Sequence, residues 1–579
     1  MNARMVSAAL VLFIELSAGA GAQAGQGKTI PKAKPPSHSG TGIKKAAQAI
    51  QSQAAAKSGS AKSKSGPALK AVVDKATDTA DGACIKCHGE QVSPGAVAQW
   101  HQSKHARAGV TCMACHGASK SDADSWLHQG QYVATIVTPG DCAKCHKQQT
   151  TEFMASHHST ASLFIGSLDN YLGAFVEGHQ ATVSGCKQCH GSRLRISKHF
   201  EDGSKLTIDM EEVSQKALNK LKADGKHVMI AKDELREEMK KLINEELKPF
   251  EGKTLKKELA GISIDKDTWP NSGMGRINAD GSMGSCNACH SRHSFSKALA
   301  RQPDNCGKCH MGPDHPQIEI YNESKHGIAF RNRLSEMNLD HPGWIVGKDY
   351  SAAPTCATCH MSATRTQPVT HDVGLRISYT LRPIISKLTT SHSAVLDELG
   401  EIKSITLSAQ EKRKRMQDVC SACHAQTHVN NFYAQYDALV SLYNGKFAQP
   451  ATKIMEYIKA HNYIDTKVPF GSDIEWKFYE LWHHEGRRMR MGASMMGPDY
   501  TQWHGAFEVA RNFYFHFLPL AREIAEKNHD EELSKLIADE LATPDHQWMT
   551  GLTQEQRKQM LEFYQKRYGE NSALIQRAK

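Results

Sequence analysis

The sequence predicts a mainly α-helical fold that contains little regular strand and ends in long helices. Three observations favour this fold. All 16 cysteines fall into eight copies of one short pattern, Cys-x-x-Cys-His, within residues 84–424. The stretch between the fourth and fifth copies has apolar residues at helical spacing. Residues 431–579 contain long, aromatic-rich segments of helical character and no further copy of the pattern.

The repeated pattern is the attachment signature of c-type haem, in which two thiols bond to the porphyrin and the next histidine binds the iron. Structural zinc sites use separated cysteine pairs, and a disulfide framework has no reason to repeat one spacing eight times. We therefore expect eight covalent haems that fill much of the interior. The attachment cysteines are Cys84, Cys87, Cys112, Cys115, Cys142, Cys145, Cys186, Cys189, Cys286, Cys289, Cys306, Cys309, Cys356, Cys359, Cys420 and Cys423. The proximal ligands are His88, His116, His146, His190, His290, His310, His360 and His424.

The first 24 residues predict a secretory signal peptide. They have a basic start, a short apolar centre and a small-x-small end at Ala22-Gln23-Ala24. No later stretch is apolar and long enough to predict a transmembrane segment. The expected location is the periplasm or another exported bacterial compartment, where the protein would be soluble.

Residues 25–80 predict a disordered linker rich in lysine, alanine and serine. This stretch has ten lysines against Asp74 and Asp78, so it carries +8 of the chain's net charge of +10. The rest of the chain is nearly neutral, which gives no support for nucleic-acid binding. The linker is interpreted as a solvated spacer, with contact to anionic lipid or an acidic redox partner as the alternative.

Residues 81–430 are interpreted as the haem-bearing catalytic region, with a surface helical insertion at about 200–265. The insertion has Leu235, Met239, Leu242, Ile243 and Leu247 on one helical face. Residues 431–579 are expected to form helices that cover the haem core and build a subunit interface. Asp499, with Gln502 three residues later, predicts a capping box at the start of one of these helices.

Most haem irons need a second axial ligand, and 23 of the 31 histidines lie outside the motifs. These are enough for seven haems with two histidine ligands and one haem with an open site. Either histidine of the pair at 157 and 158 could serve, and His158 is the one chosen. The distal candidates are His105, His128, His158, His179, His293, His326, His371 and His504.

An enzyme, unlike an electron conduit, needs polar groups that move protons beside an open iron. Asp314 and His315 lie between two prolines, a few residues after the sixth motif, so both are held near a haem edge. Tyr350, six residues before the seventh motif, is a third polar candidate, although a tyrosine there is more often a packing residue.

Five stretches give the chain a specific family resemblance over roughly residues 81–530. They are WPNSGMGRINADG (269–281), CHMGPDHPQIEIYNESKHG (309–327), PTCATCHMSATR (354–365), THDVGLRIS (370–378) and MMGPDYTQWHG (495–505). Together with the eight motifs, they resemble the octahaem hydroxylamine oxidoreductase family. The linker and much of residues 200–260 lie outside this resemblance.

The resemblance implies that the haem of the fourth motif, at Cys186, Cys189 and His190, is catalytic and open on its distal side. Oxidative members form homotrimers in which a tyrosine from a neighbouring subunit is covalently joined to this haem. By motif that tyrosine is Tyr500 here. Such a bond would distort the porphyrin and disfavour reduction of its iron, and reductive relatives lack the tyrosine.

The implied activity is oxidation of hydroxylamine to nitric oxide or nitrite, with electrons passing through seven other haems to an acceptor such as a small cytochrome c. Asp314 and His315 would accept protons, and Tyr350 would help to orient the ligand. Two alternatives stay open at this stage. One is a hydrazine dehydrogenase that forms dinitrogen, and the other is a non-catalytic multihaem electron conduit.

Overall fold

The structure of the protein is a computed structural model that describes residues 81–166, 172–226, 232–268, 273–551 and 553–569. The predicted signal peptide, the linker and residues 269–272 of the family motif lie outside these ranges. The chain divides into two compact units, residues 76–521 and residues 522–579 together with 1–75. Every motif and every candidate site residue lies in the first of these units.

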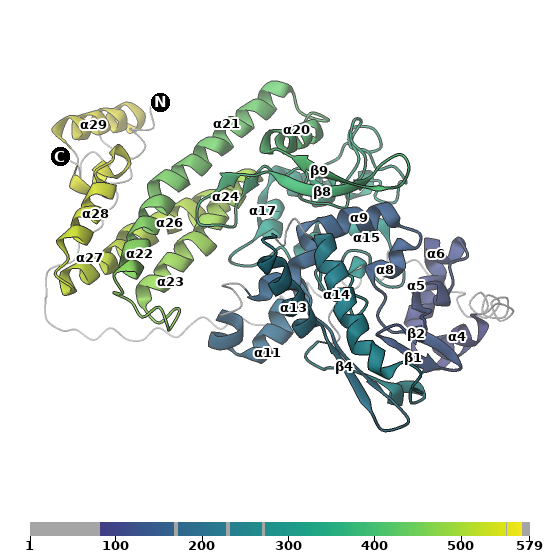
Figure 1. Cartoon of the computed structure of the whole chain (residues 1–579). Helices are drawn as coiled ribbons and strands as arrows, with labels where there is room; N and C mark the ends of the chain where they lie inside the picture. The colour runs from purple at the N-terminus through teal and green to yellow at the C-terminus, as the bar shows by residue number, and fades with distance from the viewer. Residues whose placement is uncertain (1–80, 167–171, 227–231, 269–272, 552, 570–579) are drawn as a thin grey trace, which may run out of the picture. The chain divides into compact units, whose positions relative to one another are not determined.

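The fold is mainly α-helical, as the sequence predicts (Figure 1). In the haem-motif region most helices have nine residues or fewer. The helices of this region are α4 (Gly82–Cys87), α5 (Pro94–Gln102), α6 (Lys104–Arg107), α7 (Cys112–His116), α8 (Pro139–Ala143), α9 (Lys147–Ala155), α11 (His179–Ala181), α12 (Lys187–His190), α13 (Met210–Ala223), α14 (Lys232–Leu247), α15 (Lys297–Arg301), α16 (Pro303–Gly307), α17 (Gln317–Glu323), α18 (Lys325–Asn332), α19 (Cys356–His360) and α20 (Ala409–Cys420). Shorter π and 3-10 segments link them: η1 (His88–Val92), η2 (His157–Gly166), η3 (Leu172–Glu177), η4 (Thr182–Cys186), η5 (Lys248–Phe250), η6 (Glu258–Gly261), η7 (Cys286–Ala288) and η8 (Leu334–Glu336).

The strands of the described residues are few, short and antiparallel. They are β1 (Ser125–His128), β2 (Gln131–Ala134), β3 (Arg195–His199), β4 (Lys205–Asp209), β5 (Ile262–Ile264), β6 (Tyr379–Thr380), β7 (Lys387–Leu388), β8 (Ser391–Leu396) and β9 (Ile402–Leu407). The sheet with strand order β4-β3-β5 and the β1-β2 and β8-β9 hairpins are details that the sequence analysis did not predict.

The expected helical insertion consists of α13 and α14, which pack against each other. Leu235, Met239 and Ile243 of α14 are buried, and Leu242 and Leu247 pack beside them, which confirms the predicted apolar face. The opposite face of α14 is exposed at Asp233, Glu237 and Lys241, so α14 lies at the surface with its apolar face turned inward. That apolar face belongs to a core cluster that includes Ile196 of β3, so the helices pack onto the sheet.

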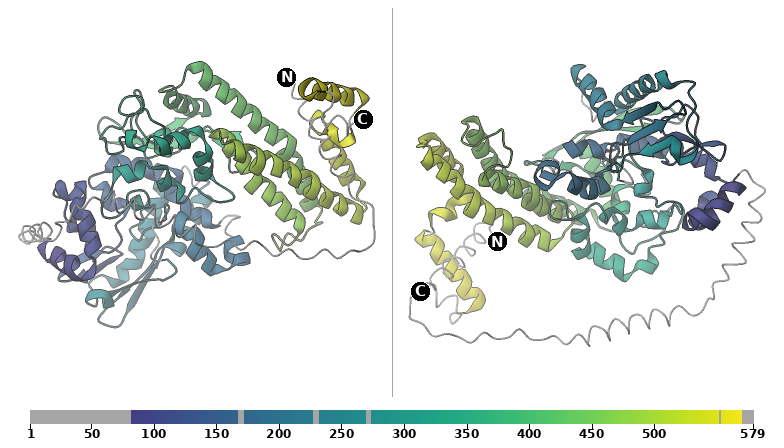
Figure 2. Two further views of the ribbon diagram at one scale, coloured as in Figure 1. Left: turned by 180° about the vertical axis from the view of Figure 1, so that it is seen from behind. Right: turned by 90° about the horizontal axis from the view of Figure 1, so that it is seen from below.

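The C-terminal part of the first unit consists of long helices that lie side by side (Figures 1 and 2). They are α21 (Gln426–Tyr443), α22 (Gln449–Ala460), α23 (Asp473–Tyr479), α24 (Gly486–Ser494), α25 (Pro498–Thr501) and α26 (Glu508–Asn512), joined by the π segments η9 (Asn444–Ala448), η10 (Glu480–Glu485), η11 (Gln502–Phe507) and η12 (Phe513–Phe517). Helix α24 packs against α21, α17 and α25 and so connects this bundle to the haem-motif region.

The predicted capping box at Asp499 is wrong. Helix α25 starts at Pro498 with Gly497 as its N-cap, and no side chain caps it. Asp499 instead contacts His504, with its Oδ2 atom 3.4 Å from Nε2. The backbone at Gly497 leaves no room for a capping side chain, because an added Cβ would lie 2.5 Å from Glu323.

Helix α27 (Leu518–Lys527) begins in the first unit and ends in the second. The second unit then contains α28 (Glu531–Leu541), η13 (Pro544–Thr550) and α29 (Gln554–Tyr568). Within the part of the chain that the structure describes, none of the helices combines the length and apolar character that crossing a membrane requires.

Candidate haem-binding site

The attachment motifs adopt helical turns that place their side chains together. Motif two is α7 and motif seven is α19, and the hydroxyls of Thr111 and Thr355 cap the two helices. One helical turn brings residues three apart to the same face, so both cysteines of a motif point the same way and the histidine follows them. All sixteen cysteines lie in described residues, and none forms a disulfide.

Five motif histidines face a second histidine at a nearly constant distance. The pairs, with the separation of their ring centres, are His88 and His128 at 6.2 Å, His105 and His146 at 6.1 Å, His116 and His293 at 6.3 Å, His158 and His310 at 6.1 Å, and His326 and His424 at 6.1 Å.

This separation fits two imidazoles on opposite sides of one metal ion. An imidazole nitrogen lies about 2 Å from a bound metal, which puts two such ring centres about 6 Å apart. Rings that stack directly lie closer, as His424 and His428 do at 4.5 Å. The histidines therefore fit the iron of c-type haem, and each pair joins a motif to a candidate that the sequence analysis named.

The other distal candidates lie in different surroundings. His371 is an electrostatic neighbour of the motif histidine His290, and its backbone N–H donates to Glu152. His179 contacts Asp267, with its Nε2 atom 3.2 Å from Oδ2, and His504 contacts Asp499 and Glu508. Among the described residues, no ring contact with a motif histidine is found for His179 or His504.

Several axial candidates are oriented through their other ring nitrogen. The Nδ1 atom of His116 lies 2.9 Å from the Ala134 carbonyl, and that of His190 lies 3.2 Å from the Ala161 carbonyl. The Nδ1 atom of His88 lies 3.0 Å from the Ser93 hydroxyl. Such bonds fix the ring orientation and leave Nε2 as the nitrogen that can face iron.

Cysteines of different motifs lie next to one another, which gives the spatial order of the motifs. The thiols of motifs three and five, four and six, and six and seven are hydrogen-bonding neighbours. Weaker electrostatic contacts join motifs one and two, two and three, five and six, and seven and eight. The motifs thus run one, two, three, five, six, seven, eight, and motif four joins at motif six.

Motif four is held by an unusually close backbone contact. The N–H groups of Met274 and Gly275 donate to the carbonyls of Cys189 and His190, each at 2.9 Å. An added Cβ at Gly273 would lie 2.1 Å from the Gly191 nitrogen, and one at Gly275 would lie 2.3 Å from the Ala161 nitrogen. Gly273 and Gly275 are therefore required for the chain to pass behind motif four.

Asp314 and His315 form a hydrogen-bonded pair against motif six, where the ring centre of His315 lies 6.4 Å from that of His310. The Nδ1 atom of His315 bonds Asp314, and its Nε2 atom lies 3.0 Å from the carbonyl oxygen of Cys309. The thiol of Cys309 neighbours that of Cys189, and His315 acts electrostatically on Cys189. The two candidate acid-base residues therefore lie where the cysteines of motifs four and six meet.

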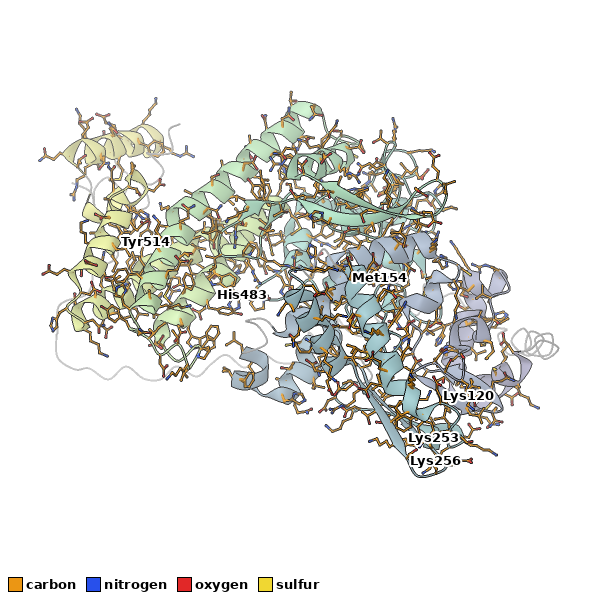
Figure 3. The ribbon with its side chains drawn as sticks, in the orientation of Figure 1. Lys120, Met154, Lys253, Lys256, His483 and Tyr514 are labelled. Carbon is orange, nitrogen blue, oxygen red and sulfur yellow. The ribbon has the colours of Figure 1, made fainter. Side chains whose placement is uncertain are left out.

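The charges around this pair shift both pKa values. Burial alone would raise the pKa of Asp314, but the hydrogen bond and charge of His315, with His483 and Arg487, hold it below its ordinary value. Burial alone would lower the pKa of His315, yet Asp314 and the Cys309 carbonyl raise it. Arg487 of α24 lies 3.4 Å from the Oδ2 atom of Asp314, and His483, labelled in Figure 3, belongs to the adjoining η10.

Tyr350 and Tyr500 have different environments. Tyr350 is buried, stacks on Trp344 with ring centres 4.5 Å apart, and shares a 2.6 Å hydrogen bond with Thr358 of motif seven. No contact between Tyr350 and the Asp314–His315 pair is found in the described residues. Tyr500 is half-buried, and its ring centre lies 5.3 Å from that of His504.

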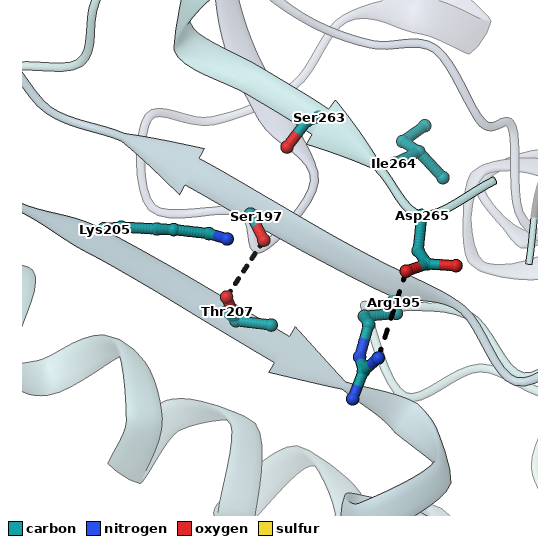
Figure 4. A pocket seen from close by; sticks show the side chains of 7 residues that line it. All are labelled: Arg195, Ser197, Lys205, Thr207, Ser263, Ile264 and Asp265. Carbon is teal, nitrogen blue, oxygen red and sulfur yellow. Dashed lines mark hydrogen bonds and ion pairs between the residues drawn. The ribbon is translucent and has the colours of Figure 1, made fainter.

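A polar cavity of about 380 Å³ lies on the β4-β3-β5 sheet (Figure 4). Its lining residues are Arg195, Ser197, Lys205, Thr207, Ser263, Ile264 and Asp265. No motif residue lines it, and Figure 4 shows Arg195 directed to Asp265 and Ser197 to Thr207. This cavity is therefore separate from the candidate haem sites.

The motifs, the paired histidines and the mainly α fold define a multihaem cytochrome of c type. The family comparisons agree. Residues 275–459 match the family described as "Seven times multi-haem cytochrome CxxCH", and residues 43–117 match "Cytochrome c554 and c-prime".

A curated protein of Kuenenia stuttgartiensis, the "Probable nitrite reductase-hydroxylamine oxidoreductase fusion protein", is 34% identical over 165 residues, 25% of this chain. The chain spans about a fifth of that relative's length, 19%.

The fold is related to that of a solved structure. A "Hypothetical multiheme protein" has a TM-score of 0.57 at 22% identity and covers 77% of this chain and 96% of its own. A reducing HAO-like protein complex of Kuenenia stuttgartiensis has a TM-score of 0.48 at 18% identity, over 78% of this chain and 86% of its own.

Sequence reasoning missed three residues that the structure brings to the site. Arg487 reaches Asp314 from α24, Glu258 contacts the ring of His128, and Glu152 contacts His371. Each lies far along the chain from its partner, so no local pattern indicated it.

Proposed function

We propose that the chain is an octahaem oxidoreductase that oxidises hydroxylamine at the haem of motif four and passes electrons through seven other haems to a redox partner. The observation that carries this proposal is the position of the Asp314–His315 pair, which contacts motif six at the point where the cysteines of motifs six and four meet. An acid-base pair that is not itself assigned to a haem iron suits a reaction that moves protons, which electron transfer alone does not require. The expected acceptor is a small cytochrome c.

The residues of this site suit removal of protons from a bound amine. A haem with an open position would supply binding of the nitrogen atom and one-electron oxidation. His315 has oxygen acceptors at both ring nitrogens, so its protonated form satisfies both contacts and the ring takes up a proton readily. Asp314 stabilises the resulting imidazolium, and Arg487 holds the carboxylate in place.

The order of the motifs supports a path for electrons out of motif four through motif six. Motif six is adjacent to motif four and also to motifs five and seven. Adjacent attachment cysteines bring the edges of their haems together, which favours transfer between them. Electrons released at motif four would enter at motif six and spread towards motif one and motif eight.

Tyr500 is proposed to cross-link to the motif-four haem of a neighbouring subunit in a homotrimer. The segment that follows it has exposed aromatic residues, Trp503 at 59%, Phe507 at 46% and Phe515 at 54% exposed. Trp503 and Phe507, four residues apart, share one face of the helix, and Phe515 extends the exposed apolar surface further along it. A second copy of the chain would cover this apolar surface and receive Tyr500 at the same time.

The curated relative from Kuenenia stuttgartiensis carries hydroxylamine oxidoreductase in its name, which supports the reaction class. The signal-like residues 1–24 and the need for haem attachment outside the cytoplasm favour an exported, periplasmic location. Hydroxylamine is proposed over hydrazine on this resemblance, and the product, nitric oxide or nitrite, follows from whether three or four electrons are removed.

The proposal is tested by steady-state oxidation of hydroxylamine and of hydrazine by the purified holoprotein, with the products identified. Hydroxylamine should be turned over with the higher kcat/KM. Tyr500→Phe should abolish the cross-link in digested holoprotein and reduce oxidation relative to reduction, whereas Tyr463→Phe serves as a control outside the site. An active protein in which the tyrosine is not bonded to haem would refute the role of Tyr500.

A further inference from the structure

The side chain of Glu258 contacts His128, the distal histidine candidate of motif one. Its Oε2 atom lies 2.7 Å from Nδ1 of His128, and its Oε1 atom accepts the Gln129 N–H at 3.0 Å. Both carboxylate oxygens are therefore engaged by neighbouring residues of the β1-β2 turn. The ring of His128 faces His88 on its other side, 6.2 Å away.

The backbone of Glu258 has an unusual conformation. Glu258 has a φ of 53°, in the left-handed region that glutamate rarely adopts, at the start of η6. Three residues later, an added Cβ at Gly261 would lie 2.1 Å from the Lys256 carbonyl oxygen, so only glycine allows this tight turn. The loop thus holds a strained residue where its carboxylate meets His128.

The charged partner sets this contact apart from those of three motif histidines, although the distal candidates His371 and His504 also have carboxylate neighbours. His88 has a hydroxyl partner, while His116 and His190 have backbone carbonyl partners, all of them neutral. A carboxylate that accepts the Nδ1 proton makes the imidazole a stronger electron donor through Nε2. A stronger donor stabilises ferric over ferrous iron.

We propose that Glu258 is a positioning residue that lowers the reduction potential of the haem at motif one by accepting the Nδ1–H of His128. The proposal rests on the ligation of that haem by His88 and His128 within the proposed function. Motif one stands at one end of the motif series, and its Cys87 is exposed. Glu258 therefore acts on a terminal haem at the surface, where an electron would be passed on and not retained.

The test is a spectropotentiometric titration of the full holoprotein at neutral pH. His128→Ala first identifies the motif-one haem, because that haem should change from low spin to high spin. Glu258→Gln keeps the side-chain shape and removes the charge. It should raise the midpoint potential of the same haem, with about a tenfold higher ferrous-to-ferric ratio at a fixed potential, or about 59 mV.

Glu258→Asp, which retains the charge, should recover part of the shift, and the EPR signal of this haem should change in Glu258→Gln. Glu251→Gln removes the same charge from an exposed turn and should leave the potential unaltered. A Glu258→Gln protein whose motif-one haem titrates as in the parent would overturn the proposal. A His128→Ala protein that keeps every haem low spin would overturn the ligation on which it rests, whatever the outcome with hydroxylamine.

Discussion

The ring of His158 lies opposite the ring of His310, with the two centres 6.1 Å apart, although His158 belongs to η2 and His310 to the sixth motif. Desolvation by the surrounding protein lowers the pKa of His158 to about 3, so its imidazole is neutral at all ordinary pH values. A neutral imidazole is the form that binds a metal.

Replacing His158 with alanine should therefore convert one low-spin haem to high spin, because the motif-six iron loses its second nitrogen ligand. EPR and absorption spectra of the holoprotein measure the change. His199→Ala is the matched control, since the His199 ring bonds Ser263 in the sheet. The assignment fails if the two variants give the same spectra.

Asp314→Asn should shift the pH dependence of hydroxylamine oxidation. Activity should rise with pH as His315 loses its proton. The midpoint of this rise should lie above the ordinary histidine pKa of about 6.5, because Asp314 raises the pKa of His315. In Asp314→Asn the midpoint of the rise should move to lower pH, and kcat should fall by roughly 10²-fold. Profiles of kcat/KM against pH measure both effects.

Asp304→Asn provides the control for this profile, because Asp304 is exposed in the helix before the sixth motif. The pH profile of Asp304→Asn should rise with the same midpoint as that of the parent protein. An Asp314→Asn profile whose midpoint stays in place would show that His315 is not the group that titrates.

Gly275→Ala should weaken the attachment of motif four to the chain behind it. The new methyl group would meet the Ala161 nitrogen at 2.3 Å, and relief of such overpacking costs about 1–3 kcal/mol of unfolding free energy. Thermal unfolding and the haem-to-protein ratio measure the loss. Gly185→Ala, where the methyl group has open space, should be tolerated, and equal effects of the two variants would contradict the close contact.

Arg490→Lys should destabilise the helical bundle by about 3 kcal/mol. The guanidinium is fully buried, donates to the Gly486 and Pro383 carbonyls and to the Ser386 hydroxyl, and lies 4.1 Å from the Tyr443 ring centre. A lysine ammonium cannot donate to all of these acceptors in the geometry of a guanidinium, so some buried acceptors would be left unpaired. Denaturant unfolding should show a large loss for Arg490→Lys and none for the exposed Arg511→Lys.

Local patterns predicted the helical character, the apolar face of α14 and the residues of the five histidine pairs. They did not show which partners meet, because His105 and His146, or His326 and His424, are brought together by tertiary packing and not by spacing along the chain. The sheet beside α14 was also missed.

The Asp499 capping box failed for a related reason. The sequence allowed a cap, but Gly497 takes the N-cap position against Glu323, and Asp499 is left to contact His504. Arg487 and Glu258 had no detectable signal, because a charged residue on a helix or in a loop is usually a solvated one.

Motif four joins the series of motifs at motif six, so electron transfer out of motif four would depend on the haem of motif six. Because motif six adjoins motifs four, five and seven, loss of its haem would break the direct route from motif four to either terminus in a single event. Loss of the haem at motif one or at motif eight would remove only one of the two ends at which electrons could leave. Under the proposed function, loss of the haem at Cys306 and Cys309 would separate motif four from the other haems, whereas loss of the haem at either end of the motif series would leave the other end connected.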